Sequence, residues 1–267
     1  MNNTTLTTLS IITVNLNNKS GLTKTINSVS QAKIPASEFI VIDGESTDGS
    51  VDIITNHKHI IDFWISEKDN GIYSAMNKGI SISNGLYLMF LNSGDCVCDV
   101  DSINSLISFA EQSSHPDIVY GNISVVESLG RTWTRMYPAN LTLDYFREDT
   151  INHQASLIKR SLFDEFGKYP ESFRLASDFW LYLKAISHRK SFKYFDETVV
   201  VYDNNGISAN NMQKYLAEKE AIWNELVPAE FQTILLENKE LKNLTSSRFV
   251  KIGIKLSKFY NSWRNKF

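Results

Sequence analysis

The chain has 267 residues, of which 42% are hydrophobic and 21% are charged. These values are ordinary for a globular protein that buries a core of its own, and they exclude a disordered or fibrous chain. The net charge of -3 gives no reason to expect a nucleic acid as partner.

Short apolar runs alternate with helical stretches through the first half of the chain. The expected strands are residues 9–14, 39–42, 63–65 and 86–91, and the expected helices between them are residues 21–32, 50–57 and 72–82. Repeated β-α-β units predict an α/β fold with a mostly parallel central sheet flanked by helices.

The second half of the chain is less regular. Helices are expected at residues 102–114 and 178–187, and strands at residues 117–121, 154–159 and 192–202. No internal repeat or low-complexity linker interrupts the sequence. The simplest division is one α/β domain over residues 1–208, followed by a helical carboxyl-terminal extension over residues 209–267.

Polar turns follow each of the first four expected strands. They are residues 15–18 (NLNN), 43–49 (DGESTDG), 67–71 (EKDNG) and 92–95 (NSGD). One such turn would mean little, because Asp, Asn, Ser and Gly are common in loops. Ligands of parallel sheets bind beyond the carboxyl ends of the strands, so four such turns on one edge predict a binding site.

Six segments, taken in order, resemble a known family. They are SIITVNLNN from Ser10, FIVIDGESTDGS from Phe39, EKDNGIYSAMNKGI from Glu67, LYLMFLNSGD from Leu86, HQASLIKR from His153 and ASDFWLYLKA from Ala176. This set is similar to bacterial family 2 glycosyltransferases, particularly those that build exopolysaccharide or O-antigen repeat units. The resemblance implies a Rossmann-like GT-A fold and a nucleoside-diphosphate-sugar donor, with UDP sugars expected first. It also implies a divalent metal, Mn2+ or Mg2+, and inversion at the anomeric carbon.

The candidates for binding the donor are Asn15, Asp43, Asp69, Asn77 and Lys78. Asp43 ends an expected strand, where a carboxylate can accept hydrogen bonds from a base or a ribose, and the resemblance assigns it that role. Asp69 precedes a helix whose amino-terminal N–H groups can receive the anionic groups of the donor. For Lys78 the alternative is an ordinary solvated lysine on a helix.

The candidates for binding the metal are Asp95 and His153. Mg2+ and Mn2+ take oxygen ligands and stabilise the negative charge of a departing phosphate, so Asp95 is chemically suited to hold one. The family usually has Asp-x-Asp at this turn, whereas Ser93 stands here in place of the first acid. His153 can supply a further ligand, or it can be a histidine whose ring is satisfied by hydrogen bonds near the core.

Asp178 is the candidate catalytic residue. Inverting transfer needs a carboxylate that takes the proton of the acceptor hydroxyl as that hydroxyl attacks. Asp178 stands where a helix is expected to begin, and the positive end of the helix favours its ionised form. The alternative is a first-turn aspartate that only stabilises the helix, and it is the resemblance that favours the catalytic role.

Two other functions compete with single-sugar transfer. A sugar nucleotidyltransferase would need a glycine-rich basic loop after the first strand, and residues 15–18 contain neither glycine nor arginine. A degenerate transferase that only binds a carbohydrate or serves as a scaffold stays open because of Ser93. The Gln-x-x-Arg-Trp sequence of processive synthases is absent, so one sugar per encounter is expected. Residues 204–208 can close over bound donor or form an ordinary turn.

The carboxyl-terminal tail carries a separate pattern. Residues 248–267 hold six basic residues and no acidic one, with apolar residues at helical spacing. This pattern suits an anionic membrane surface, or alternatively a helix packed on the protein's own core. A lipid-linked oligosaccharide is the acceptor that the family and the basic tail favour, and a free saccharide is the alternative.

The cellular location follows from what the sequence lacks. No run of about 18 apolar residues is present that could span a bilayer as a helix. The amino-terminal residues do not read as a secretion signal, and the only two cysteines, Cys96 and Cys98, are too close for an ordinary disulfide. We expect a cytoplasmic protein, attached peripherally to the inner face of the plasma membrane if the tail binds lipid.

Overall fold

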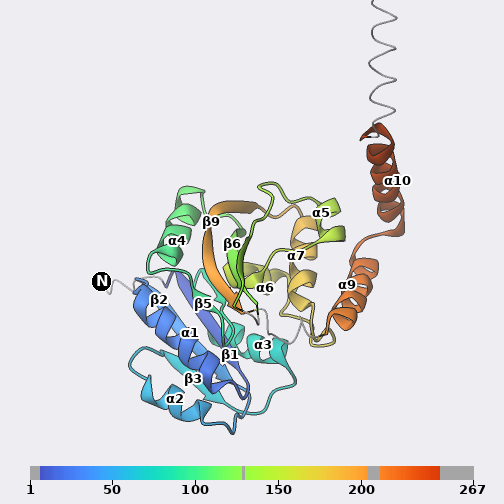
Figure 1. Ribbon diagram of the computed structural model, residues 1–267. Helices are drawn as coiled ribbons and strands as arrows, with labels where there is room; N and C mark the ends of the chain where they lie inside the picture. Colours follow the sequence, from blue (N-terminus) through green and yellow to red (C-terminus); the bar gives the residue numbers. More distant parts are fainter. Residues whose placement is uncertain (1–6, 128–129, 204–210, 247–267) are drawn as a thin grey trace, which may run out of the picture. The chain divides into compact units, whose positions relative to one another are not determined.

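The computed structural model describes residues 7–127, 130–203 and 211–246 (Figure 1). The chain divides into two compact units, residues 1–222 and 223–267. The loop at residues 204–208 and the basic tail at residues 248–267 lie outside the described residues. Within the part that is described, no helix is long and apolar enough to cross a membrane.

The first half of the chain forms a parallel sheet with crossover helices, as the alternating pattern predicts. Its strands are β1 (Leu9–Asn15), β2 (Ser37–Asp43), β3 (Phe63–Ser66) and β4 (Tyr87–Phe90). Its helices are α1 (Lys19–Ala32), α2 (Ser50–Asn56) and α3 (Ile72–Ile82). In space the strands lie in the order β3-β2-β1-β4, and every neighbouring pair is parallel. Parallel pairing brings the carboxyl ends of these strands, and the polar turns that follow them, to one edge.

The second half extends the same sheet with strands of both directions. Its elements are β5 (Cys96–Val97), α4 (Ser102–Gln112), β6 (Ile118–Val126), β7 (Thr132–Arg135), α5 (Leu143–Glu148), the 3-10 turn η1 (His153–Ala155), β8 (Ser156–Lys159), α6 (Ser161–Phe166), α7 (Ser177–Ser187) and β9 (Phe192–Asp203). The described strands follow the order β3-β2-β1-β4-β8-β6-β9-β5, with β7 paired to β6. Because β8 is antiparallel to both β4 and β6, the complete sheet is mixed.

The sheet buries apolar side chains on both faces. On one face the strands contribute Leu9, Ile11, Val41 and Met89 to a core that also contains residues of α1, α2 and α4. On the other face α3 packs against β1 and β2, and β4 contacts α6 through Phe90. Successive strand residues point to opposite faces, so runs such as residues 9–15, buried throughout, indicate a strand covered on both sides.

Glycine at position 79 allows α3 to approach β1 closely. A Cβ atom at Gly79 would stand 2.5 Å from Cγ2 of Ile12, closer than side chains come to one another. The helix is thereby held against the strand whose end carries Asn15. The loop before α3 carries Asp69, so this packing fixes both residues relative to the sheet.

Two helices follow β9. Helix α9 (Met212–Leu226) begins in the first compact unit and ends in the second, and α10 (Ala229–Ser246) lies in the second. The domain boundary expected at residue 208 stays a prediction, because residues 204–210 lie outside the described part of the chain.

Candidate active site

Asn15 and Asp43 meet where β1 and β2 end. They are partners in the strand register, and Nδ2 of Asn15 donates to Oδ1 of Asp43 at 2.7 Å. Asp43 also accepts hydrogen bonds from the backbone N–H and hydroxyl of Ser46 and from the hydroxyl of Ser66. Burial alone would raise the pKa of Asp43, but these hydrogen bonds outweigh it and hold the pKa below its ordinary value. In this structure the fully buried, ionised Asp43 shapes the turn that follows β2.

Asp69 lies against that turn. A Cβ atom at Gly44 would stand 2.7 Å from Oδ2 of Asp69, so glycine is needed for the two loops to touch. Oδ1 of Asp69 accepts the N–H of Gly71, the residue that precedes α3. Gly71 has a φ of 118°, which L side chains rarely adopt. Asp69 thus lies beside the turn after β2, close to Asp43 in the candidate site.

Asn77 and Lys78 face other partners. The side-chain amide of Asn77 forms two hydrogen bonds with the backbone of Tyr169. Its Nδ2 donates to the Tyr169 carbonyl at 2.8 Å, and its Oδ1 accepts the Tyr169 N–H at 3.0 Å. Lys78 donates to the carbonyl of Lys68 at 3.0 Å and pairs with Glu67 at 2.9 Å. These contacts hold the chain segments around α3 in place, and a donor role for either residue stays a prediction.

The turn at residues 92–95 is fastened to β1 through Ser93. The hydroxyl of Ser93 donates to Oδ1 of Asn15 at 2.8 Å, and Asn18 donates through Nδ2 to the Ser93 carbonyl at 3.0 Å. Ser93 therefore ties this turn to Asn15, one of the candidates for donor binding, and to Asn18. The next carboxylate in the turn, that of Asp95, is buried, and burial raises its pKa to about 7.

Asp178 is held by donors from three elements. Its Oδ1 accepts the hydroxyl of Tyr73 and the N–H of Phe179, both at 2.9 Å, and its Oδ2 lies 2.9 Å from Nδ1 of His153. Burial alone would raise the pKa of Asp178, but the hydrogen bond and charge of His153, together with the Tyr73 and Phe179 contacts, lower it below the ordinary value. Asp178 is therefore ionised although its side chain is only 13% exposed.

His153 connects Asp178 to the turn after β4. Its Nε2 lies 3.2 Å from Nδ2 of Asn92, so both ring nitrogens have partners. Coordination of a metal by His153 would require Asn92 to move, and this role stays a prediction. The contacts Asp43–Asn15–Ser93 and Asn92–His153–Asp178 share the turn at residues 92–95, so one hydrogen-bond network joins Asp43 and Asp178 through the turn that also carries Asp95.

The sequence offered no sign of a second carboxylate beside Asp95. The backbone N–H of Asp203, the last residue of β9, donates to Oδ1 of Asp95 at 3.2 Å. Oδ2 of Asp203 lies 4.0 Å from the position of a Cβ atom at Gly94. Within the described residues no group of three or more His, Cys, Asp or Glu side chains is placed to hold a metal ion. Asp95 and Asp203 are two oxygen donors of the kind that Mg2+ and Mn2+ take, so the residues present fit a cation that completes its coordination with ligand oxygens and water.

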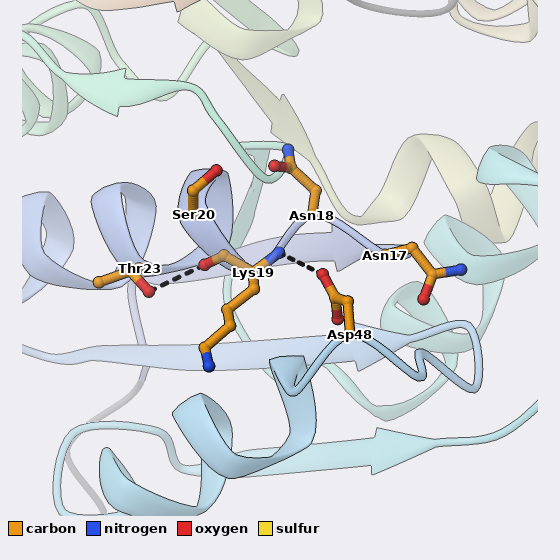
Figure 2. Close-up of a pocket in the computed structure, with 6 residues that line it drawn as sticks. All are labelled: Asn17, Asn18, Lys19, Ser20, Thr23 and Asp48. Carbon is orange, nitrogen blue, oxygen red and sulfur yellow. Dashed lines mark hydrogen bonds between the residues drawn. The ribbon is translucent and has the colours of Figure 1, made fainter.

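A shallow hollow of about 560 Å³ opens beside this network. Figure 2 shows that it is lined by the start of α1 and by Asp48, whose carboxylate accepts the N–H of Lys19 at 2.7 Å. None of the residues expected to bind donor or metal lines this hollow. We take the network that joins Asp43 and Asp178 as the candidate site, because the transfer reaction expected from the sequence needs carboxylates. The hollow offers only the carboxylate of Asp48, which is already bonded within the protein.

Tyr73, Asn92 and Asp203 were not among the residues expected from the sequence. Tyr73 had a usable signal, since it follows the turn after β3 by two residues and is the second residue of α3. Asp203 also ends a strand, but that strand is far along the chain and joins the sheet by pairing with β6. Its proximity to Asp95 depends on tertiary structure alone.

Comparison with known proteins assigns the chain to a family. The model of glycosyl transferase family 2 matches residues 10–189. A PGL/p-HBAD biosynthesis glycosyltransferase of Mycobacterium bovis is 27% identical over 210 residues, which cover 76% of this chain and 79% of that protein. An uncharacterized glycosyltransferase of Mycobacterium tuberculosis is 30% identical over 184 residues, which cover 68% of this chain and 70% of that protein.

Solved structures share the fold. TarS of S. aureus, in complex with UDP-GlcNAc, superposes with a TM-score of 0.68 at 16% identity, covering 93% of this chain and 76% of that one. A mannosyltransferase of Pyrobaculum calidifontis, in complex with GDP-Man and Mn2+, gives a TM-score of 0.62 at 16% identity, covering 85% of this chain and 67% of that one. The mixed sheet with flanking helices is thus the GT-A-like fold that the resemblance implies. By its sequence and its fold, the chain belongs to glycosyltransferase family 2 and is a transferase of sugars.

Proposed function

We propose that the chain moves a single sugar from a nucleoside-diphosphate sugar to a hydroxyl of a saccharide or lipid-linked oligosaccharide, with inversion at the anomeric carbon. The observation that carries this proposal is Asp178, a partly exposed carboxylate kept ionised by three donors within the hydrogen-bond network. A base in this state accepts a proton without first having to lose one.

The proposed reaction is a single displacement. The acceptor oxygen attacks the anomeric carbon, its proton passes to a carboxylate oxygen of Asp178, and the bond from that carbon to the diphosphate oxygen breaks with its electron pair left on the phosphate. His153 and Tyr73 hold the carboxylate in one orientation throughout. Asp95 and Asp203 would hold a divalent cation, which stabilises the charge of the leaving diphosphate when it is bound.

The donor side is formed by the turns after β1, β2 and β3. Asn15, Asp43 and Asp69 are the residues that we assign to nucleotide and ribose, directly or through the turns that they hold. A UDP sugar is the first candidate, supported by the UDP-GlcNAc that TarS binds, and the GDP-Man of the archaeal mannosyltransferase is the second. Synthesis of a surface polysaccharide or glycolipid is supported by the names of the relatives, which include a teichuronic acid biosynthesis glycosyltransferase of Bacillus subtilis.

A transfer assay tests this proposal. The full chain is incubated with UDP and GDP sugars, with Mn2+, Mg2+ or a chelator, and with free and lipid-linked saccharide acceptors. NMR of the product gives the anomeric configuration of the new bond. We expect one added sugar of inverted configuration. Retention of configuration would contradict the proposed role of Asp178, and donor binding without turnover on any acceptor would favour the degenerate scaffold.

A further inference from the structure

A carboxylate from α9 binds three consecutive backbone N–H groups just before Asp178. Oε1 of Glu218 accepts the N–H of Arg174 at 3.0 Å, and Oε2 accepts those of Leu175 at 2.7 Å and Ala176 at 3.1 Å. Glu218 lies 42 to 44 residues away along the chain from these three donors. The contact is therefore tertiary, and it belongs entirely to the first compact unit.

Glu218 binds the chain segment that leads into α7. Helix α7 (Ser177–Ser187) begins after Ala176, so the three N–H groups that Glu218 accepts belong to the residues directly before the first turn of the helix. A negative charge near a helix amino terminus is favourable, and here it comes from a different helix. The carboxylate thus fixes the backbone from which Asp178, in the first turn of α7, projects.

The peptide at Leu175 links Glu218 to the carboxylate of Asp178. The N–H of Leu175 donates to Glu218, and its carbonyl lies 3.1 Å from the hydroxyl of Tyr73. The same hydroxyl lies 2.9 Å from Oδ1 of Asp178. A shift of the loop at residues 174–176 would therefore disturb both the backbone of Asp178 and the tyrosine that orients its side chain.

Helix α9 is fixed beside Asp178 by the next residue as well. The ammonium of Lys219 donates to the carbonyl of Asp149 at 3.2 Å and lies 4.6 Å from the ring centroid of Phe179. Phe179 follows Asp178 directly and donates its N–H to that carboxylate. Consecutive residues of α9 therefore contact the chain on both sides of Asp178.

We propose that Glu218 is a positioning residue for Asp178, so that α9 of the carboxyl-terminal extension forms part of the catalytic machinery. This inference rests on the proposed function of Asp178. Glu218 touches neither donor nor acceptor in this role. It acts through three peptide groups, which hold the carboxylate of Asp178 where it can take the proton of the acceptor hydroxyl. Misplacing a catalytic group by about 1 Å can cost about 100-fold in rate.

The test compares variants of the full chain at Glu218. Glu218→Ala removes the acceptor, and Glu218→Gln keeps one oxygen in the same place. Glu220→Ala is the matched control, because Glu220 lies two residues away on α9 and forms an exposed pair with Arg147 at 2.6 Å. For each variant, kcat, KM for donor and the dissociation constant and stoichiometry of a UDP sugar are measured, and Glu218→Ala is also assayed with added formate.

We expect Glu218→Ala to lower kcat by at least about tenfold while the stoichiometry and affinity of donor binding are unchanged. Glu218→Gln should lie between this variant and the wild type, and Glu220→Ala should match the wild type. Formate should restore part of the lost kcat, since it can occupy the vacated N–H groups, and a general loss of folding would not respond to it.

Either of two results would overturn the inference. One is a kcat for Glu218→Ala equal to that of Glu220→Ala. The other is a fall in kcat that formate does not restore, together with an equal fall in the stoichiometry of donor binding. Asp178→Asn, assayed alongside, separates this inference from the proposed function. If Asp178→Asn is fully active, Asp178 is not the base and the proposed function fails. If Asp178→Asn is inactive but Glu218→Ala is fully active, only the positioning role of Glu218 is rejected.

Discussion

Asp95 is buried and Asp178 is largely shielded from solvent, yet their surroundings move the pKa values of the two acids in opposite directions. Burial dominates at Asp95 and raises its pKa to about 7. At Asp178 the contacts with His153, Tyr73 and Phe179 outweigh burial and lower the pKa. Paired carboxyl groups with divergent pKa values often mark different roles in one site. Here the separation suits a proton acceptor at Asp178 and a cation ligand at Asp95, whose charge is best tolerated when a cation is present.

The residue-scale prediction concerns His153. Replacing it by phenylalanine removes the donor to Oδ2 while leaving Asp178 buried, so the pKa of Asp178 should rise. Since the base must be ionised, the acid limb of the kcat/KM profile should move to higher pH. His153→Asn, whose amide can donate in place of Nδ1, is the control and should keep the limb near its original position.

The pH profile also separates the two roles considered for His153. A positioning partner of Asp178 should change the acid limb with little effect on the Mn2+ concentration needed for half-maximal activity. An unchanged acid limb in His153→Phe, together with a much larger Mn2+ requirement, would instead identify His153 as a metal ligand.

The element-scale prediction concerns the contact between α3 and β1. Gly79→Ala places a Cβ atom 2.5 Å from Cγ2 of Ile12, and the helix must move outward to relieve the overlap. Overpacking of this kind costs about 1–3 kcal/mol, more than the gain from the better helix propensity of alanine. Urea denaturation should show this loss in the free energy of unfolding. Ser81→Ala, at an exposed position of the same helix, should change stability by less than about 0.5 kcal/mol. Equal stability of Gly79→Ala and wild type would contradict the close packing.

Much of the fold could be predicted at the scale of elements. Residues 72–82 form the expected helix, and each of the first four strands lies within two residues of its expected bounds, because buried strands and amphipathic helices have clear patterns. The strands β5 and β7 were missed because β5 has only two residues and β7 is mostly exposed, so neither forms a buried apolar run. The insertion of antiparallel β8 between β4 and β6 could not be predicted either. It depends on pairing between segments distant in sequence.

The site was predictable to the extent that it follows strand ends. Asn15 and Asp43 end strands β1 and β2, and Asp69 lies three residues after β3, so the places of these three candidates could be predicted from the strand ends, whereas their roles stay predictions. The amide of Asn77, another candidate, holds the backbone of Tyr169, and its donor role stays a prediction as well. No pattern in the sequence predicts a role for Glu218. Its role depends on the docking of α9 onto a loop more than 40 residues earlier in the chain.

The whole-molecule prediction concerns the basic tail. Removing residues 248–267 takes away six positive charges and leaves the described residues intact. We expect this deletion to abolish binding to vesicles that contain anionic lipid, because both the charges and the apolar residues that favour a membrane surface are lost. Co-sedimentation with anionic and neutral vesicles measures the binding of each chain. The full chain should bind the anionic vesicles less strongly as salt increases. If the truncated chain binds the anionic vesicles as strongly as the full chain, the basic tail is not a membrane anchor.

The proposed function requires that acids from separated segments reach one site and that one of them, Asp178, takes a proton. The most direct measurement is the turnover of Asp178→Asn beside its affinity for the donor. Asparagine has nearly the same shape but cannot serve as a base of this kind, so kcat should fall by at least about 100-fold while the dissociation constant of the donor stays unchanged. A variant that turns over at the rate of the wild type would show that Asp178 is not the base.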